Sequence, residues 1–234
     1  MGQLKPRDFT EIKIIDTLTE KDRSCPVCLL VENSVEQLID TILYELVNDP
    51  QVRSHLRETG LCKRHIDKVQ QHLQKHPELG LLGIAIIYED MIDNHIKTLN
   101  ETTSLNHNCY LCDRESEIEK MYITSFSKFF NSREGLDLFR RSKSILCIDH
   151  YHKLLSKIDQ AFKDSFSEIE MTKLTLLKND LSTFIKKHDY RNKTPFKEEE
   201  ATAYKIVGGI ISKPVNLNTR RSSRWKPWKL SQDA

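Results

Sequence analysis

The stretch Cys25-Pro26-Val27-Cys28 decides the fold, because it recurs downstream as Cys109-Tyr110-Leu111-Cys112. Each of these pairs is followed by a cysteine and a histidine three residues apart, in Cys62-Lys63-Arg64-His65 and in Cys147-Ile148-Asp149-His150. The two copies of the first motif are 84 residues apart, and the two copies of the second are 85 residues apart. The chain is therefore one module used twice, with one inserted residue.

The composition around these motifs is typical of a helical protein with hydrated outer faces. The chain has 234 residues, of which 38% are hydrophobic and 30% are charged. With seven glycines and seven prolines, it has too few turn residues for a β-rich architecture. The longest apolar run, about Leu79 to Tyr88, is too short to cross a bilayer. Since no secretory leader pattern stands at the N-terminus, we expect the protein in the cytoplasm.

The spacing of apolar residues predicts a long, a short, a medium and a long helix in the first copy. The long helix begins at Cys25, and Asn48-Asp49-Pro50 caps the short one. The short helix ends at Gly60, the medium helix begins near Cys62, and Pro77 separates it from the fourth. The first helix has a stripe of apolar residues three or four apart: Val31, Val35, Leu38, Ile42 and Leu46.

The second copy repeats this order. Asn131-Ser132 caps its short helix, and the third helix is expected to run from Cys147 to Phe162. Ser165-Phe166-Ser167-Glu168 has the spacing of a capping box and can start the fourth helix. The third and fourth helices could also run together, and we prefer a break. The apolar residues of the first helix of this copy are Ile118, Tyr122, Phe126 and Phe129.

The two ends of the chain follow different patterns. Residues 1–24 are compatible with a short strand or with part of a helix. After Thr194-Pro195, a further helix begins at Glu198-Glu199-Glu200, whose charges suit the positive end of a helix dipole. It ends at Gly208-Gly209 or shortly after.

The sequence therefore predicts an all-α protein, built as two tandem four-helix zinc-binding repeats plus a C-terminal helix and a disordered basic tail. The predicted boundaries, in chain order, are 1–24 for the N-terminal segment, 25–105 for repeat 1, 106–192 for repeat 2, 193–213 for the C-terminal helix and 214–234 for the tail.

All six cysteines belong to the motifs, which in a reducing compartment favours metal ligation over disulfides. A helix N-terminus, with its free N–H groups, suits thiolates. The cysteine and histidine of each second motif lie on one helix face. We expect each repeat to close its own site with three thiolates and one imidazole, which is a structural zinc pattern. The expected ligand sets, one Zn²⁺ per set, are Cys25, Cys28, Cys62 and His65 in repeat 1, and Cys109, Cys112, Cys147 and His150 in repeat 2.

Charge near the motifs predicts a difference between the two sites. Three thiolates and one Zn²⁺ leave one negative charge, which Lys63 and Arg64 can offset in the first site, whereas Asp149 stands in the second. His107 and His152 are alternative ligands, although surface positions are the simpler interpretation. Reduced core cysteines and a redox dithiol are the other readings of the cysteine pairs. An iron–sulfur cluster fits three cysteines and a histidine less well.

No signature of an enzyme accompanies the cysteines. Sites with four protein donors leave no position for a catalytic water, and there is no His-Glu-x-x-His, phosphate-binding glycine loop or Gly-x-Ser-x-Gly motif. The polar clusters at Tyr88-Glu89-Asp90 and at His188-Asp189-Tyr190-Arg191 are interpreted as a solvated helix face and a packing or capping turn. We predict no catalytic residue and no organic cofactor.

The tail, residues 214–234, has five basic residues and one acidic residue, a net charge of +4. Basic and aromatic side chains alternate in it, as in segments that contact phosphates and stack on bases of single-stranded nucleic acid. A peptide that docks on a protein, a membrane-surface anchor and a solubilising tail have similar compositions. The candidate binding residues are Arg220, Arg221, Arg224, Trp225, Lys226, Trp228 and Lys229.

Several further segments resemble a prokaryotic family of unknown function whose members are two-repeat helical proteins with CxxC and CxxH motifs. The matching segments are Cys25-Pro26-Val27-Cys28, residues 43–50, Gly60-Leu61-Cys62 with His65, residues 87–90 and residues 188–191. The second copy departs from the family pattern at Tyr110, where proline is usual, and at Ile145, which replaces a glycine. The resemblance brings no activity with it. Our hypothesis is a zinc-stabilised interaction module for protein or nucleic acid, and the alternative is a zinc-dependent enzyme or a thiol redox protein.

Overall fold

The computed structural model describes residues 6–99 and 109–212, and within these ranges it contains helices and no strand. The predicted all-α class is therefore confirmed. The helices in chain order are α1 (Phe9–Thr19), α2 (Pro26–Tyr44), α3 (Pro50–Thr59), α4 (Lys63–Lys75), the 3-10 turn η1 (Pro77–Leu79), α5 (Leu82–Thr98), α6 (Tyr110–Phe130), α7 (Arg133–Arg141), α8 (Ile148–Leu155), α9 (Gln160–Lys187) and α10 (Glu198–Ile211).

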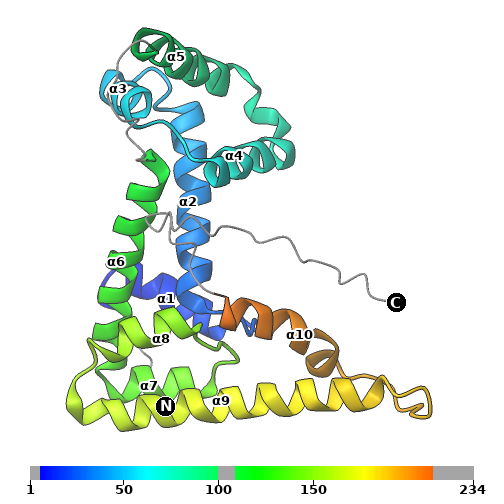
Figure 1. Cartoon of the computed structure of the whole chain (residues 1–234). Coiled ribbons are helices and arrows are strands. Elements are labelled where there is room, and N and C mark those ends of the chain that lie inside the picture. Colours follow the sequence, from blue (N-terminus) through cyan, green and yellow to red (C-terminus); the bar gives the residue numbers. More distant parts are fainter. Residues whose placement is uncertain (1–5, 100–108, 213–234) are drawn as a thin grey trace, which may run out of the picture.

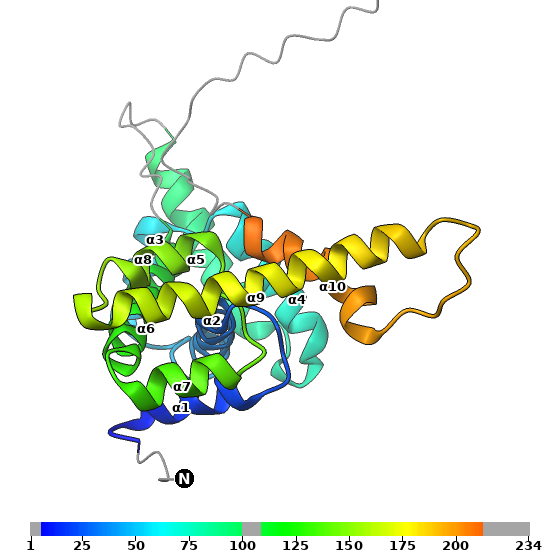
Figure 2. The same cartoon turned by 90° about the horizontal axis from the view of Figure 1, so that it is seen from below.

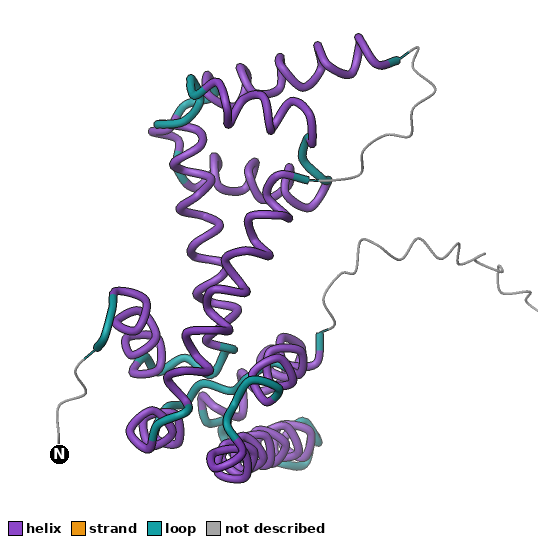
Figure 3. Tube along the Cα trace, turned by 90° about the vertical axis from the view of Figure 1, so that its left-hand side faces the viewer, coloured by secondary structure: helices purple, strands orange, loops and turns teal. Residues whose placement is uncertain are grey.

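Two long helices, α2 and α6, pack side by side and form the axis of the molecule (Figure 1). They run in opposite directions, so the beginning of each lies toward the end of the other (Figures 1 and 3). A hydrogen bond between Ser34 Oγ and Tyr122 Oη, 3.0 Å long, joins them partway along. Because α2 belongs to the first copy of the module and α6 to the second, the two copies share this axis.

The remaining helices gather at the two ends of the axis. Helices α3, α4 and α5 lie at one end, where α2 finishes and α6 starts (Figure 1). Helices α1, α7, α8 and α9 surround the other end, and α10 packs along α9 as an antiparallel hairpin (Figure 2). The molecule therefore has two lobes joined by the α2–α6 pair. No helix of the described residues combines the length and the apolar character that crossing a membrane requires.

Most of the local signals predicted from the sequence are confirmed. Asp49 caps α3 by accepting hydrogen bonds from two backbone N–H groups, at 2.9 Å each. Gly60 ends α3 with a φ of 67°, a left-handed conformation that favours glycine. Ser132 caps α7 through the backbone N–H of Gly135. The long, short, medium, long order holds in the first copy, and in the second the third helix, α8, is itself short at 8 residues.

Four predicted details are wrong or become definite. The ambiguous N-terminal segment contains a helix, α1, rather than a strand. Helix α8 ends at Leu155, before the predicted Phe162. The preferred break before the fourth helix is present, but α9 begins after Asp159, and Ser165 lies inside it instead of capping it. Helix α10 passes through the two glycines and ends shortly after them, at Ile211, in agreement with the later of the two predicted ends.

One continuous core holds the described chain together. It contains apolar side chains from both copies, and within it the aromatic rings of Phe126, Phe130, Phe139 and Phe166 are completely buried. A second, small cluster lies between α9 and α10 and is formed by Ile145, Leu177, Ala203 and Ile210. Since the main core crosses the boundary between the copies, neither copy buries its apolar faces alone.

Candidate metal centres

The first cysteine of every motif occupies the same place, the N-cap of a helix. Cys25 precedes α2, Cys62 precedes α4, Cys109 precedes α6 and Cys147 precedes α8. The backbone N–H groups of the first helical turn lack partners within the helix and point toward the cap. At α8, for example, the Cys147 sulfur accepts the N–H of His150 at 3.5 Å. Each motif thus places its sulfurs where negative charge is stabilised.

The structure brings the eight predicted ligands together in two groups of four, in which all donor atoms lie within 4.8 Å of one another. The pairing differs from the prediction. One group, the Cys25 cluster, consists of Cys25, Cys28, Cys147 and His150, and the other, the Cys62 cluster, consists of Cys62, His65, Cys109 and Cys112. Each CxxC therefore meets the CxxH of the other copy, and the expectation that each repeat closes its own site is wrong.

Helix lengths explain this crossed pairing. Helix α2 has 19 residues and so spans roughly 29 Å, whereas α3, with 10 residues, spans only about 15 Å. After α2 has carried the chain to one end of the molecule, α3 is too short to bring Cys62 back to Cys25. Helix α6 runs antiparallel to α2, so its own CxxC arrives beside Cys62, and the same argument holds for α7 and Cys147 (Figure 1).

In the Cys25 cluster, three sulfurs surround one imidazole nitrogen. His150 Nδ1 lies 3.4 Å from the Cys25 sulfur, 3.2 Å from that of Cys28 and 3.1 Å from that of Cys147. The sulfurs of Cys28 and Cys147 are 3.8 Å apart. Cys25, Cys147 and His150 are buried, and Cys28 is exposed. Three of the four donor residues are therefore shielded from solvent.

The Cys62 cluster repeats this arrangement. His65 Nδ1 lies 3.4 Å from the Cys62 sulfur, 3.2 Å from that of Cys109 and 3.4 Å from that of Cys112. The sulfurs of Cys62 and Cys112 are 3.7 Å apart, and the His65 side chain is 0% exposed. Since both clusters use Nδ1 and similar spacings, the departures of the second copy at Tyr110 and Ile145 do not disturb the donor geometry.

Backbone hydrogen bonds fix the two loops that meet at each cluster. The N–H of Tyr110 donates to the carbonyl of Gly60 at 3.1 Å, beside the Cys62 cluster. The N–H of Ile145 donates to the carbonyl of Arg23 at 3.3 Å, beside the Cys25 cluster. Each bond joins a residue one or two positions from one ligand to the loop that carries the opposing motif. The donors are therefore held in place by the fold as well as by any ion between them.

Two glutamates of α6 lie beside the outer nitrogens of the histidines, and one of them accepts a hydrogen bond there. Glu119 accepts a hydrogen bond from His150 Nε2 at 2.8 Å and another from Lys153 at 2.7 Å. Glu115 lies 3.4 Å from His65 Nε2, just outside hydrogen-bond geometry, and pairs with Arg64. A carboxylate on Nε2 keeps the proton there and leaves Nδ1 free to bind an ion. Motif searching missed both glutamates, although they follow Cys112 at helical spacings of three and seven.

The charged side chains near the two clusters differ, but only some of them are the residues predicted from the sequence. Arg64 Nη2 lies 3.9 Å from the Cys112 sulfur, so it can offset thiolate charge as expected. Lys63, however, pairs with Asp67 on the exposed side of α4, and Asp149 is neutralised by Lys153 at 2.6 Å. At the Cys62 cluster, the basic residue Arg64 therefore lies beside a sulfur. At the Cys25 cluster, the basic residue Lys153 instead contacts Glu119, the carboxylate that binds His150.

Burial and hydrogen bonding shift the pKa values of the cluster thiols in opposite directions. Burial raises the pKa of Cys109, but hydrogen bonds from His65 and the backbone outweigh it and lower that pKa to about 6. Burial raises the pKa of Cys112 to about 12 and also raises that of Cys25. In His150, hydrogen bonds to sulfurs and to Glu119 outweigh burial and raise the pKa to about 11. A bound dication would replace these protons, so binding would release them.

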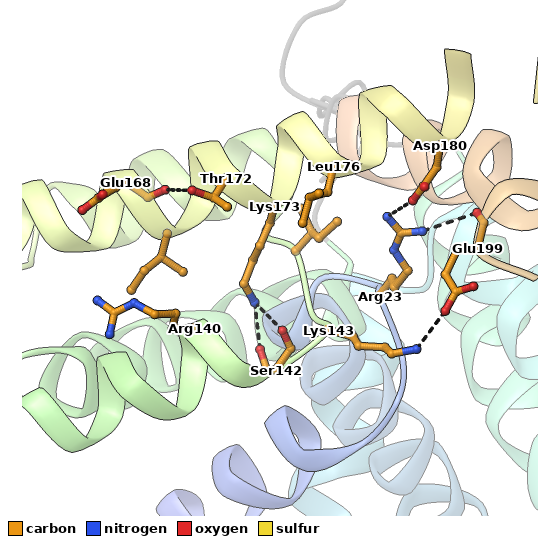
Figure 4. A pocket seen from close by; sticks show the side chains of 12 residues that line it. Arg23, Arg140, Ser142, Lys143, Glu168, Thr172, Lys173, Leu176, Asp180 and Glu199 are labelled. Carbon is orange, nitrogen blue, oxygen red and sulfur yellow. Dashed lines mark hydrogen bonds and ion pairs between the residues drawn. The ribbon is translucent and has the colours of Figure 1, made fainter. Parts of the chain in front are cut away.

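Helix α9 secures the segment that delivers Cys147. The Lys173 ammonium donates to the carbonyl of Ser142 at 2.9 Å (Figure 4). It also donates to the carbonyl of Ser144 at 2.7 Å and lies over the ring of Phe139. The buried Glu170 carboxyl accepts the N–H of Leu146 at 3.0 Å. Burial raises the pKa of Glu170 to about 8 and lowers that of Lys173 to about 8. The sequence offered no signal for this contact, since both residues look like members of a solvated helix face.

A cavity of 570 Å³ lies beside this contact, between α9 and the loops at Arg23 and Lys143. Its charged side chains are largely paired with one another: Arg23 contacts Asp180 at 2.8 Å and the carbonyl of Glu199 at 3.4 Å (Figure 4). Lys143 contacts the Glu199 carboxylate at 3.1 Å. These pairs attach α9, through Asp180, and α10, through Glu199, to the loops in front of the Cys25 cluster.

Among the described residues, the other sequence-predicted candidates lie apart from the clusters. His152 is exposed and is absent from both donor groups. Asp90 pairs with Arg53 at 2.6 Å, and Asp189 pairs with Arg191 in an exposed turn. His107 and the tail residues from Arg220 to Lys229 lie outside the described residues.

Fold and site together define a class: an all-helical protein in which two copies of one module exchange Cys and His donors to form two four-donor clusters. The sequence profile of the "Family of unknown function (DUF6062)" matches residues 6–104 and again residues 87–203, and the chain belongs to this family. An "Uncharacterized 23.9 kDa protein in xynA 3'region" from Caldicellulosiruptor sp. (strain Rt8B.4) is 29% identical over 181 residues, which cover 74% of this chain and 86% of that protein. No solved structure matches the chain.

Proposed function

We propose that the protein is a zinc-stabilised helical scaffold in which two structural Cys3His sites lock the two copies of the module together. The observation that supports this best is the spacing of the donors. A tetrahedral zinc ion with three thiolates and one imidazole requires sulfurs about 3.8 Å apart and sulfur–nitrogen distances of about 3.6 Å. The sulfur pairs at 3.8 and 3.7 Å match these edges, and the sulfur–nitrogen distances are slightly shorter.

The chemistry of the donors supports a structural role over a catalytic one. Each cluster already supplies four protein donors, so a tetrahedral ion has no position left for a water that could be activated. Three thiolates favour zinc over the harder magnesium and calcium ions, which prefer oxygen. Three thiolates with one dication leave one negative charge, which Arg64 offsets at the Cys62 cluster.

Metal analysis tests the proposal directly. We expect the purified chain to carry two equivalents of zinc, and we expect a strong chelator to remove helical signal and lower the melting temperature as the metal leaves. Protein that is fully folded and metal-free after purification without chelator would contradict the structural role. A fold that survives metal removal while an activity is lost would instead favour a zinc-dependent enzyme or a thiol redox protein.

We further propose that this scaffold serves as an interaction module or adaptor for protein or nucleic acid in a reducing compartment. The support is compositional: the basic, tryptophan-containing tail carries a net charge of +4, opposite in sign to the mildly acidic remainder of the chain. Capture of partners from native cells with the full chain and with a chain lacking residues 214–234 tests this role. An unchanged set of proteins and nucleic acids after removal of the tail would exclude the tail as the binding segment.

A further inference from the structure

Helix α5 presents two apolar faces, of which only one packs against other described residues. Its inner face packs on α2 and α3, with Ile84 and Ile87 buried. Gly83 makes this close packing possible, because a Cβ there would lie 2.4 Å from the carbonyl oxygen of Leu43. Figure 1 shows α5 at the outer edge of its lobe, with its other side turned away from α2 and α3.

The outer face carries a regular stripe of exposed positions. Leu82, Ile92, Ile96 and Leu99 are 75%, 53%, 59% and 64% exposed. Two further exposed residues, Ala85 and Glu89, belong to the same stripe. The six residues are spaced alternately three and four apart, which is the spacing of the a and d positions of a heptad repeat. The stripe consists of Leu82, Ala85, Glu89, Ile92, Ile96 and Leu99.

We propose that this stripe pairs with the same stripe of a second copy of the chain, as an antiparallel helix pair. The proposal is independent of the metal and goes beyond the scaffold role. An apolar seam of this length left in water is unfavourable, and a heptad seam is satisfied by another helix rather than by an irregular surface.

The order of residues along the stripe favours a second copy of the chain as the partner and sets the direction in which the two helices pair. In an antiparallel pair, an a position meets a d position of the partner helix. Leu82 then meets Leu99 of the second copy, Ala85 meets Ile96, and Glu89 meets Ile92. All six positions are used, and the smallest side chain, Ala85, stands opposite a bulky one.

A parallel pair of the same stripes fits poorly. It would place Glu89 opposite Glu89 of the second copy in one layer, where two carboxylates repel and lose water. It would also place Ala85 against Ala85 and leave a gap. In the antiparallel pair, Tyr88 of one copy faces His95 of the other beside the seam, and Ile86 faces Asp93. No two side chains of like charge therefore face each other at these flanking positions.

The stripe also continues beyond the helix. Leu81, directly before α5, is 70% exposed, and Tyr44, next to the Leu43 that packs on Gly83, is 77% exposed. Both can add apolar area at the end where Leu82 meets Leu99 of the second copy. An interface of this modest size predicts a dimer dissociation constant on the order of 1–100 µM.

Sedimentation equilibrium of the full chain, purified with the metal it carries, tests the pairing. We expect a concentration-dependent dimer that Ile92→Glu with Ile96→Glu weakens by roughly tenfold or more, with unchanged far-ultraviolet circular dichroism. Met171→Glu removes an equally exposed apolar side chain from α9 and is the matched control, which should not affect the dimer. A chain that stays monomeric up to about 500 µM would overturn the proposal.

Two further variants keep the test decisive if the double glutamate variant unfolds. Glu89→Leu removes the one charged residue of the seam and should tighten the dimer by roughly tenfold, whereas a dimer formed elsewhere should not respond. The double variant Leu82→Lys with Leu99→Glu places opposite charges together only in the antiparallel pair. It should associate more tightly than either single variant, and failure to do so would refute the antiparallel direction.

Discussion

At the scale of single residues, the histidines of the two clusters depend on what binds their outer nitrogens. His150 presents Nδ1 to three sulfurs while Nε2 is held by Glu119, and the hydrogen bond from His150 lowers the pKa of Glu119 to about 2. The carboxylate therefore stays charged at every pH at which the cluster can bind an ion. Its charge raises the basicity of the imidazole toward a metal.

Replacing this carboxylate should weaken one site only. For Glu119→Gln we expect roughly 10- to 100-fold weaker binding of one of the two proposed zinc equivalents, measured by competition with a chromophoric chelator. Glu117→Gln, on the same helix, removes an exposed carboxylate that pairs with Arg114 and serves as the control. Equal affinities of the two variants would show that Glu119 does not support His150.

At the scale of elements, α9 positions the loop before Cys147 through two buried charged residues. Glu170 and Lys173 are 2% and 8% exposed, and both contact the backbone of residues 142–146. Burial keeps a proton on Glu170, since its pKa rises from 4.5 to about 8. The neutral carboxyl avoids placing an uncompensated charge beside the cluster's thiolates.

This burial predicts a dependence of stability on pH. Between pH 4.5 and about 8 the folded chain keeps a proton on Glu170 that the unfolded chain has lost, so the free energy of unfolding falls as pH rises. Glu170→Gln retains the acceptor for Leu146 and should remove a slope of up to about 1.4 kcal/mol per pH unit. Denaturant titrations at saturating metal measure it.

The control is Glu168→Gln, on the exposed side of the same helix, which should keep the slope of the unmodified chain. Comparing variants at the same metal saturation cancels the contribution of the thiols. An identical pH profile for Glu170→Gln and the unmodified chain would mean that Glu170 is ionised in the folded state.

At the scale of the whole molecule, crossed pairing makes each cluster a link between the two copies. The sulfurs of Cys28 and Cys147 are 119 positions apart in the chain, compared with about 34 for a site within one copy. Closing the longer loop costs only about 1 kcal/mol more in conformational entropy, because this cost grows with the logarithm of loop length. Packing of α2 on α6 outweighs so small a cost, and the crossed arrangement follows.

Paired cysteine substitutions distinguish crossed sites from sites within one copy. Cys25→Ser with Cys147→Ser affects a single cluster, so one equivalent of the proposed zinc should remain tightly bound. Cys25→Ser with Cys62→Ser damages both clusters, and neither equivalent should be retained at full affinity. Elemental analysis after dialysis measures the outcome, and sites closed within each copy would give the reverse result.

The eight donors, the helical class and most helix ends could be predicted from the sequence, because they depend on local chemistry. A cysteine at an N-cap, Asp49 before Pro50 and a glycine with positive φ act within a few residues. The capping box at Ser165 gave a wrong helix start, because this local signal is present but is not used. The helix begins earlier, after Asp159, and continues through Ser165 as Phe166 packs into the core.

By itself, then, the sequence determined which side chains can bind a metal and that helices carry them. Only the tertiary structure decided which four donors share a cluster, which carboxylates lie beside His65 and His150, and which face of α5 stays exposed. The physical reason is that ligand type and helix periodicity depend on near neighbours. Pairing depends instead on where a helix of about 29 Å delivers its ends, and that depends on how α2 packs against α6.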